Sequence, residues 1–227
     1  NIFTLAWQFH PEFFMLLTGG KPKLVLLAEF TADTEEEARA LATEAKEHLS
    51  DMNLAMRVAK TEQEEEKYFA VRRESFKLLH SKIQGLTASS FIEDFAVRPE
   101  VLPEFLPKLD AILEKYKKYM VYTIAGHVGD ANFHIIPLMD LTKPEVHRVI
   151  PELMEKVHML IFEYKGTFTG EHNDGILRTP YLKDMYGATV YSLFEEVKKI
   201  FDPQNIFNPG KKVGGTKEFA KKHMVWE

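Results

Sequence analysis

Two apolar segments around one short turn constrain the fold of this chain more than any other feature. Residues 119–126 and 133–138 are mostly apolar, and a Gly-Asp turn lies between them. Such a pair predicts two antiparallel strands joined as a hairpin. Apolar residues at helical spacing begin at Pro144 and again near Val190, which predicts two amphipathic helices. The hairpin is therefore expected to belong to a sheet that helices cover.

Short strands and helices also alternate elsewhere in the chain. Residues 24–31, 54–60 and 91–97 are short apolar runs, which predict strands. T-x-x-E capping boxes at Thr34 and Thr61 predict that a helix follows each of the first two runs. We therefore expect an α+β fold, a ferredoxin-like sandwich in which an antiparallel or mixed sheet is covered by helices.

Composition and charge exclude several classes of protein. The chain has 29 Lys and Arg against 34 Asp and Glu, whereas a general nucleic-acid-binding protein needs a basic face. It has no cysteine, which excludes disulfides, thiolate metal sites and cysteine nucleophiles. No apolar stretch approaches the roughly 18 residues of a transmembrane helix, and no targeting segment is recognisable. We expect a cytoplasmic protein, or one attached peripherally to the inner membrane through a partner.

The segment G-H-V-G-D-A-N-F-H carries the densest group of polar side chains. If its turn lies at Asp130 and Ala131, then His127 stands opposite His134 on the hairpin. Opposed residues share a face, so the two imidazoles could hold one metal ion. Asn132 lies two residues before His134 and should share that face. The alternative is a hairpin with two incidental histidines.

A second polar segment, T-G-E-H-N-D-G, follows the long helix that begins at Pro144. Glu171 could supply a carboxylate ligand, and His172 could be a base or a third imidazole. Taken alone, this segment is better interpreted as a solvated polar turn. Together with the hairpin histidines it offers a ligand set that leaves positions open for substrate.

An arginine pair, Arg72 and Arg73, lies in the helix expected after Thr61. A guanidinium group in an apolar setting can hold a carboxylate with two hydrogen bonds. Adjacent arginines point about 100° apart on a helix, so at most one of them would face a site. On the residues alone, a surface ion pair with Glu74 or Glu66 is the better interpretation.

Three motifs, in this order, resemble one known family. They are G-H-V-G-D-A-N-F-H (126–134), T-G-E-H-N-D-G (169–175) and F-D-P-Q-N-I-F-N-P-G-K (201–211). Together with V-R-R-E (71–74), they resemble the C-terminal domain of FAD-linked oxidases, flavin dehydrogenases of the vanillyl-alcohol-oxidase superfamily. That family includes D-lactate dehydrogenase, D-2-hydroxyglutarate dehydrogenase and the flavin subunit of glycolate oxidase.

The resemblance implies a metal centre and a catalytic base. His127, His134 and Glu171 correspond to the ligands of a divalent metal. Two imidazoles with one carboxylate suit Zn²⁺, Mn²⁺ or Fe²⁺ alike. His172 corresponds to the catalytic base near the flavin ring.

The resemblance also implies contacts to substrate and cofactor. Arg72 corresponds to the clamp on the substrate carboxylate, and Asn132 to a polar substrate contact. Asn208 corresponds to the turn that returns towards the flavin. Asn173 and Ala131 stand where the family usually has glycine, and this departure leaves the substrate open.

We expect residues 23–227 to form this C-terminal domain, with residues 1–22 as an irregular lead-in. We also expect that the chain lacks an FAD-binding domain, so that FAD would be bound mainly by a domain in cis or in trans. The expected reaction is oxidation of a D-2-hydroxy acid to the 2-oxo acid, with an unknown electron acceptor. The chain alone should be inactive, whether it is a fragment or a separately encoded subunit.

Two other functions remain open at this point. The same histidines and carboxylate could activate water in a stand-alone metal-dependent hydrolase. The segment after residue 200 argues against a hydrolase, which has no evident use for it. The chain could also be a non-catalytic module that docks on a flavin domain, with the apolar residues of 1–22 as its surface.

Overall fold

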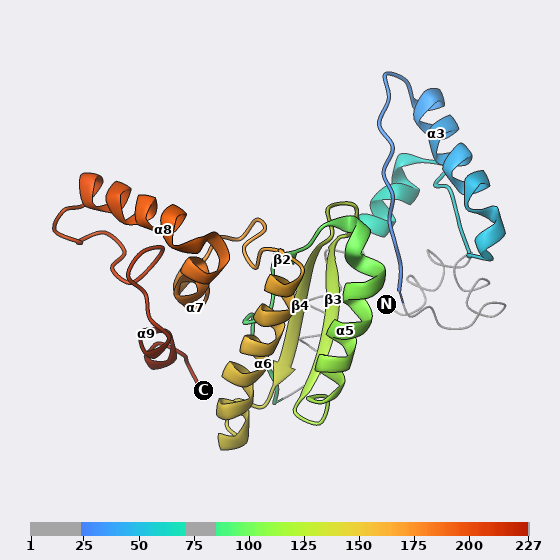
Figure 1. Cartoon of the computed structure of the whole chain (residues 1–227). Helices are drawn as coiled ribbons and strands as arrows, with labels where there is room; N and C mark the ends of the chain where they lie inside the picture. The colour runs from blue at the N-terminus through green and yellow to red at the C-terminus, as the bar shows by residue number, and fades with distance from the viewer. Residues whose placement is uncertain (1–23, 71–84, 227) are drawn as a thin grey trace. The chain divides into compact units, whose positions relative to one another are not determined.

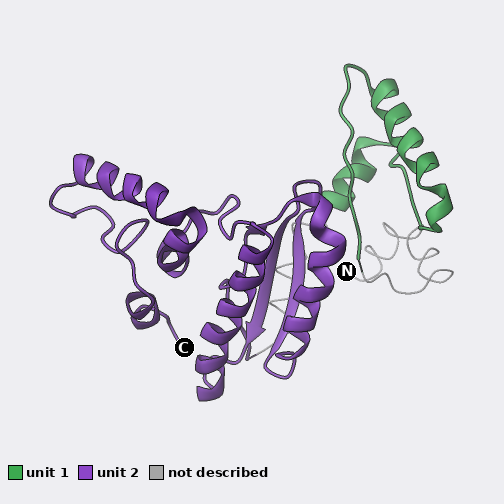
Figure 2. Ribbon diagram, in the orientation of Figure 1, with its two compact units in different colours: residues 1–79 green, residues 80–227 purple. Residues whose placement is uncertain are grey.

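The computed structural model describes residues 24–70 and 85–226. The chain divides into two compact units, residues 1–79 and residues 80–227 (Figure 1 and Figure 2). The expected arginine clamp, Arg72, and the expected lead-in, 1–22, lie outside the described residues.

The described part of the first unit is helical where a helix was predicted. Helix α3 spans Glu35–His48, and a short 3₁₀ turn, Ser50–Met52, follows it. The capping box is confirmed: the Thr34 hydroxyl accepts from the Glu37 amide at 3.2 Å, and the Glu37 carboxylate accepts from the Thr34 amide at 3.1 Å. Each of the two side chains thus accepts a hydrogen bond from a backbone amide that has no partner within the helix.

The prediction of strands at 24–31 and 54–60 is wrong. Neither segment forms a strand in the described residues. Leu24 and Val25 are 64% and 71% exposed. An apolar run becomes a strand only where another strand pairs with it and a core covers it, and neither condition is met here.

The second unit contains a four-stranded antiparallel sheet. Its strands are β1 (Thr87–Ala88), β2 (Phe95–Ala96), β3 (Met120–His127) and β4 (Asn132–Met139). Strand β4 is central: β3 pairs along its whole length, and β1 and β2 pair with its two ends. The strand expected over 91–97 is therefore much shorter, and a further short strand, β1, precedes it.

The hairpin forms, but its register differs from the one expected. A 3₁₀ turn, Val128–Asp130, and the left-handed residue Ala131 (φ 48°) make the connection longer than two residues. As a result His127 faces Asn132, and His134 faces Ala125. The expectation that His127 stands opposite His134 is wrong because the turn is longer than the one assumed.

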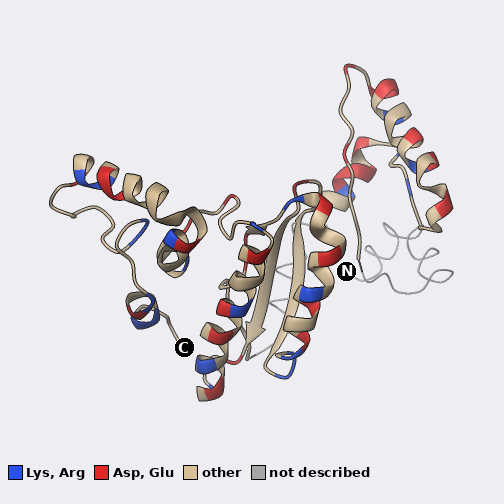
Figure 3. Cartoon of the chain, viewed as in Figure 1, with Lys and Arg blue, Asp and Glu red and all other residues tan. Residues whose placement is uncertain are grey.

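Helices α5 (Leu102–Glu114) and α6 (Pro144–Glu163) cover one face of the sheet (Figure 1). Phe105 and Leu153 are fully buried between helices and sheet. The charged residues of both helices lie on the side turned away from the strands (Figure 3). The predicted α+β class, with an antiparallel sheet covered by helices, is confirmed.

The chain after α6 forms helices α7 (Gly175–Arg178), α8 (Leu182–Phe201) and α9 (Lys217–Lys222), with a 3₁₀ turn, Thr179–Tyr181, before α8. The apolar stripe predicted for α8 is largely exposed, with Ile200 at 73% and Phe201 at 79%. No helix in the described residues is long and apolar enough to cross a membrane.

Candidate functional site

Four polar side chains from the hairpin and from one loop converge at the turn end of β3 and β4. His127 ends β3 and His134 lies on β4; their ring centroids are 5.9 Å apart, with perpendicular planes. Glu171 and His172 come from the loop after α6. The His134 and His172 rings are stacked, with their centroids 4.8 Å apart.

The Glu171 carboxylate is the meeting point of the three imidazoles. Its Oε1 lies 2.9 Å from His134 Nε2, 3.5 Å from His127 Nε2 and 3.4 Å from His172 Nε2. Ligand atoms of His127, His134 and Glu171 all lie within 4.8 Å of one another. Neighbouring ligands of a four-coordinate ion are roughly 3.4 Å apart when its bonds are about 2.1 Å long. Donor types and spacing therefore both fit a divalent metal ion.

The structure adds Glu93, a residue that the sequence reasoning missed. Its Oε2 lies 3.2 Å from His134 Nδ1 and 2.9 Å from His172 Nδ1, so one carboxylate oxygen contacts both rings. The hydrogen bond to Glu93 raises the pKa of His172. Arg178 forms an ion pair with the other oxygen of Glu93.

The neighbouring Asp94 was missed as well. It is completely buried and accepts hydrogen bonds from the backbone amides of Glu171 and His172, from the Asn132 side chain and from Arg178. Burial opposes ionisation of this carboxyl, but the hydrogen bonds outweigh burial and hold its pKa below the usual range. An acidic pair inside the otherwise apolar run Phe91–Phe95 was the available signal.

Asn132 and Asn208 are the other two expected contacts within the described residues, and they lie in different parts of the second unit. Asn132 is 7% exposed, and its Nδ2 donates to Asp94 Oδ1 at 3.2 Å and to Phe95 O at 3.3 Å. Its buried Oδ1 has no hydrogen-bond partner among the described residues. Asn208 lies in the turn after α8, where its carbonyl accepts from the Lys211 amide at 3.1 Å.

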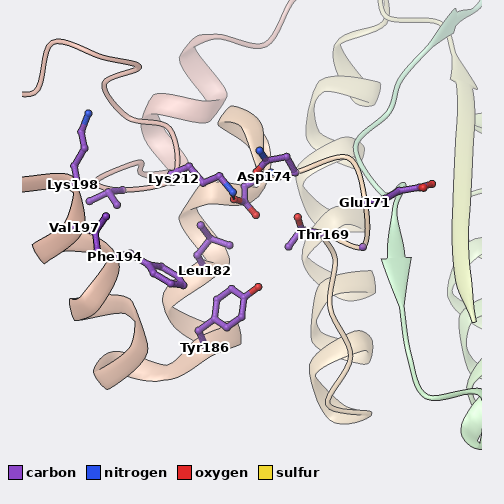
Figure 4. Close-up of a pocket in the computed structure, with 12 residues that line it drawn as sticks. Thr169, Glu171, Asp174, Leu182, Tyr186, Phe194, Val197, Lys198 and Lys212 are labelled. Carbon is purple, nitrogen blue, oxygen red and sulfur yellow. Dashed lines mark hydrogen bonds and ion pairs between the residues drawn. The ribbon is translucent and has the colours of Figure 1, made fainter. Parts of the chain in front are cut away.

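A cleft of about 600 Å³ adjoins the loop that carries Glu171. Leu182, Tyr186 and Phe194 form its apolar part, and the ion pair of Lys212 with Asp174 lies on its border (Figure 4). The Glu171 side chain points away from this group, towards the strands (Figure 4). Glu171 is nevertheless one of the residues that line the cleft, so the cleft borders the histidine cluster.

The chain is similar to known proteins of one family. The family model for FAD linked oxidases, C-terminal domain, matches residues 19–212. Three curated relatives are a D-2-hydroxyglutarate dehydrogenase of Pseudomonas putida, a D-lactate dehydrogenase of Anaerostipes hadrus and the glycolate oxidase subunit GlcD of Bacillus subtilis. They are 29%, 29% and 32% identical over 91%, 86% and 74% of this chain.

The chain corresponds to only a part of each relative. It spans 21% of the P. putida protein, 40% of the A. hadrus protein and 34% of the B. subtilis protein. The family match, in contrast, covers most of the chain and includes both polar segments of the site. This protein therefore belongs to the family of FAD linked oxidase C-terminal domains.

Proposed function

We propose that this chain is the substrate- and metal-binding half of an FAD-dependent dehydrogenase or oxidase that converts a D-2-hydroxy acid into the 2-oxo acid. The observation that carries the proposal is the convergence of His127, His134 and Glu171 at the end of the hairpin. The relatives support the substrate class, because lactate, 2-hydroxyglutarate and glycolate are all 2-hydroxy acids.

The proposed roles of the described residues follow from the positions of their side chains, and the role of Arg72, which lies outside the described residues, follows from the family resemblance alone. His127, His134 and Glu171 would hold a divalent ion (Zn²⁺, Mn²⁺ or Fe²⁺), which when bound lowers the pKa of the substrate hydroxyl. His172 would take the hydroxyl proton at Nε2, because Glu93 already occupies its Nδ1 at 2.9 Å. Arg72 would hold the substrate carboxylate, and Asn132 would offer its unpartnered Oδ1.

The redox step requires a group that this chain does not supply. A separate domain, in cis or in trans, would hold most of the FAD, which when bound would supply the acceptor for the hydride of the substrate Cα. The exposed apolar residues of α8 support such a partner: Val197 and Ile200 are 54% and 73% exposed. In this proposal Asn208, in the turn after α8, lies on the side that meets the flavin.

The test is calorimetric titration of the Mn²⁺-loaded chain with D-lactate, D-2-hydroxyglutarate and glycolate. Propionate, glutarate and acetate, which lack the hydroxyl, serve as the respective matched controls. We expect at least one hydroxy acid to bind only when the metal is present, and to lose binding in His134→Ala. Equal binding of a hydroxy acid and its deoxy control would contradict the proposed chelation.

A second experiment, an activity assay of the isolated chain, distinguishes the proposed function from that of a hydrolase. The isolated chain should not oxidise hydroxy acids with an artificial electron acceptor, because the flavin carries the redox chemistry. Turnover without a flavoprotein would refute the proposal. Hydrolysis of esters or amides that chelators abolish would favour the stand-alone hydrolase instead.

A further inference from the structure

The Asp94 carboxylate receives more hydrogen bonds than any other side chain described around the histidine cluster, and Asp94 accepts from three consecutive amides, two at its carboxylate and one at its backbone carbonyl. Its carbonyl oxygen accepts from the Gly170 amide at 3.0 Å. Its carboxylate accepts from the Glu171 amide at 3.0 Å and from the His172 amide at 2.8 Å. A single buried residue therefore holds the backbone of the segment that supplies Glu171 and His172.

We propose that Asp94 is a positioning residue: it fixes the backbone of residues 170–172 so that the Glu171 and His172 side chains meet the hairpin histidines. Its importance for activity rests on the proposed function. The contact of Asp94 with the backbone of residues 170–172, called the Asp94 clamp below, is a property of the folded chain. It can be tested without a metal or a substrate.

The chemistry of the position requires an ionised carboxylate. Besides the two amides, Asn132 Nδ2 donates to Oδ1 and Arg178 Nη1 donates to Oδ2, each at 3.2 Å. These four donors match the roughly four acceptor positions of a carboxylate, which has no donor of its own. The Arg178 guanidinium also supplies an opposite charge, without which a fully buried carboxylate would be costly.

The backbone of Asp94 adds a second constraint. Its φ is +66°, in the left-handed region that Gly, Asn and Asp adopt more readily than other residues. Asparagine can adopt this conformation, so Asp94→Asn keeps the backbone and the size of the side chain. It replaces one acceptor oxygen with an NH₂ donor, which then faces an amide donor of the segment 170–172.

Glu93 orients the His134 and His172 rings, as Asp94 positions the backbone of residues 170–172. Because its Oε2 contacts Nδ1 of both His134 and His172, it favours the tautomer with the proton on Nδ1. The Nε2 atoms, which face Glu171, then carry the free lone pairs. A carboxylate behind a ligating imidazole commonly orients the ring and contributes about 10- to 100-fold to metal affinity.

A matched control exists at the other end of the chain. Asp202, after α8, is also buried; it accepts from the amides of Ile206 and Phe207, each at 2.8 Å, and pairs with Lys198. Asp202→Asn therefore makes the same chemical change in a loop that provides none of the clustered histidines. An effect of Asp94→Asn on residues 170–172 that Asp202→Asn lacks cannot be a general effect of losing a buried carboxylate.

The experiment is amide hydrogen exchange on the metal-free full chain, for wild type, Asp94→Asn and Asp202→Asn. We expect the Glu171 and His172 amides to be protected in wild type and to exchange about 10- to 100-fold faster in Asp94→Asn only. Unchanged protection in a folded Asp94→Asn variant would overturn the proposal. If that variant does not fold, the exchange rates of the wild type decide. Unprotected amides at Glu171 and His172 in the wild type would also overturn the proposal.

Titration of the same three proteins with Mn²⁺ then separates this inference from the proposed function. We expect affinity to fall about 10- to 100-fold in Asp94→Asn and to stay unchanged in Asp202→Asn. Protected amides in a wild type that binds no metal would support the Asp94 clamp and refute the metal site. Equal affinity in all three proteins would overturn the positioning role.

Discussion

Gly170→Ala is the substitution whose effect can be worked out most directly from the structure. A Cβ at this position would lie 2.5 Å from Asn132 Nδ2 and 3.0 Å from Asp94 Oδ1. Ordinary contact begins at 3.4 Å, so the Asn132 amide or the loop must move about 0.9 Å. The backbone conformation of Gly170 is not left-handed, so no backbone strain adds to the clash.

A methyl group forced into a packed region costs about 1–3 kcal/mol. We therefore expect Gly170→Ala to lower the free energy of unfolding by that amount, measured by urea denaturation. The displaced loop should also weaken Mn²⁺ binding by about 10- to 100-fold, measured by calorimetry. Gly129→Ala is the control, because among the described residues no atom beyond its own chain neighbours would lie within 4 Å of its Cβ. Unchanged stability and Mn²⁺ affinity in Gly170→Ala would refute the close packing on which the site depends.

Three further substitutions test the fold. Burial lowers the pKa of His158 to about 3. Between about pH 6.5 and 3, therefore, only the unfolded chain takes up the proton on this imidazole. The free energy of unfolding should decrease as the pH is lowered through this range, by up to about 1.4 kcal/mol per pH unit. His158→Phe should remove this slope from urea titrations at pH 7.5 and 4.5, and an unchanged slope would contradict it. Thr34→Ala should destabilise α3 by about 1 kcal/mol, seen as faster amide exchange there, and equal exchange would count against the cap. Leu153→Ala, in the core, should cost about 2–5 kcal/mol in urea denaturation, whereas a loss well below this would mean that the core is looser than described.

Helices and the hairpin could be predicted because their signals are local. The stripe that begins at Val146 is buried along α6, and the box at Thr34 caps α3 as expected. Strand pairing is not local: the runs at 24–31 and 54–60 have the composition of strands, yet no strand pairs with them in the described residues. The stripe of α8 shows the same limit, because apolar spacing predicts a buried face without saying what buries it.

The candidate site divides in the same way. His127, His134 and Glu171 could be named from their motifs, because ligand residues stand out among glycines and polar neighbours. For Glu93 and Asp94 the sequence offers only an acidic pair in an apolar run, since their partners lie roughly 40 to 85 positions further along the chain. Their roles appear only when β2, β4 and the loop after α6 come together.

The measurement that tests the central claim most directly is anomalous diffraction from crystals of the chain grown with Zn²⁺ or Mn²⁺. We predict one anomalous peak, within bonding distance of His127 Nε2, His134 Nε2 and a Glu171 carboxylate oxygen. A peak among Glu93, His134 Nδ1 and His172 Nδ1, the other group of side chains with ligand spacing, would contradict the assignment. The absence of any peak at the hairpin would contradict the metal centre itself.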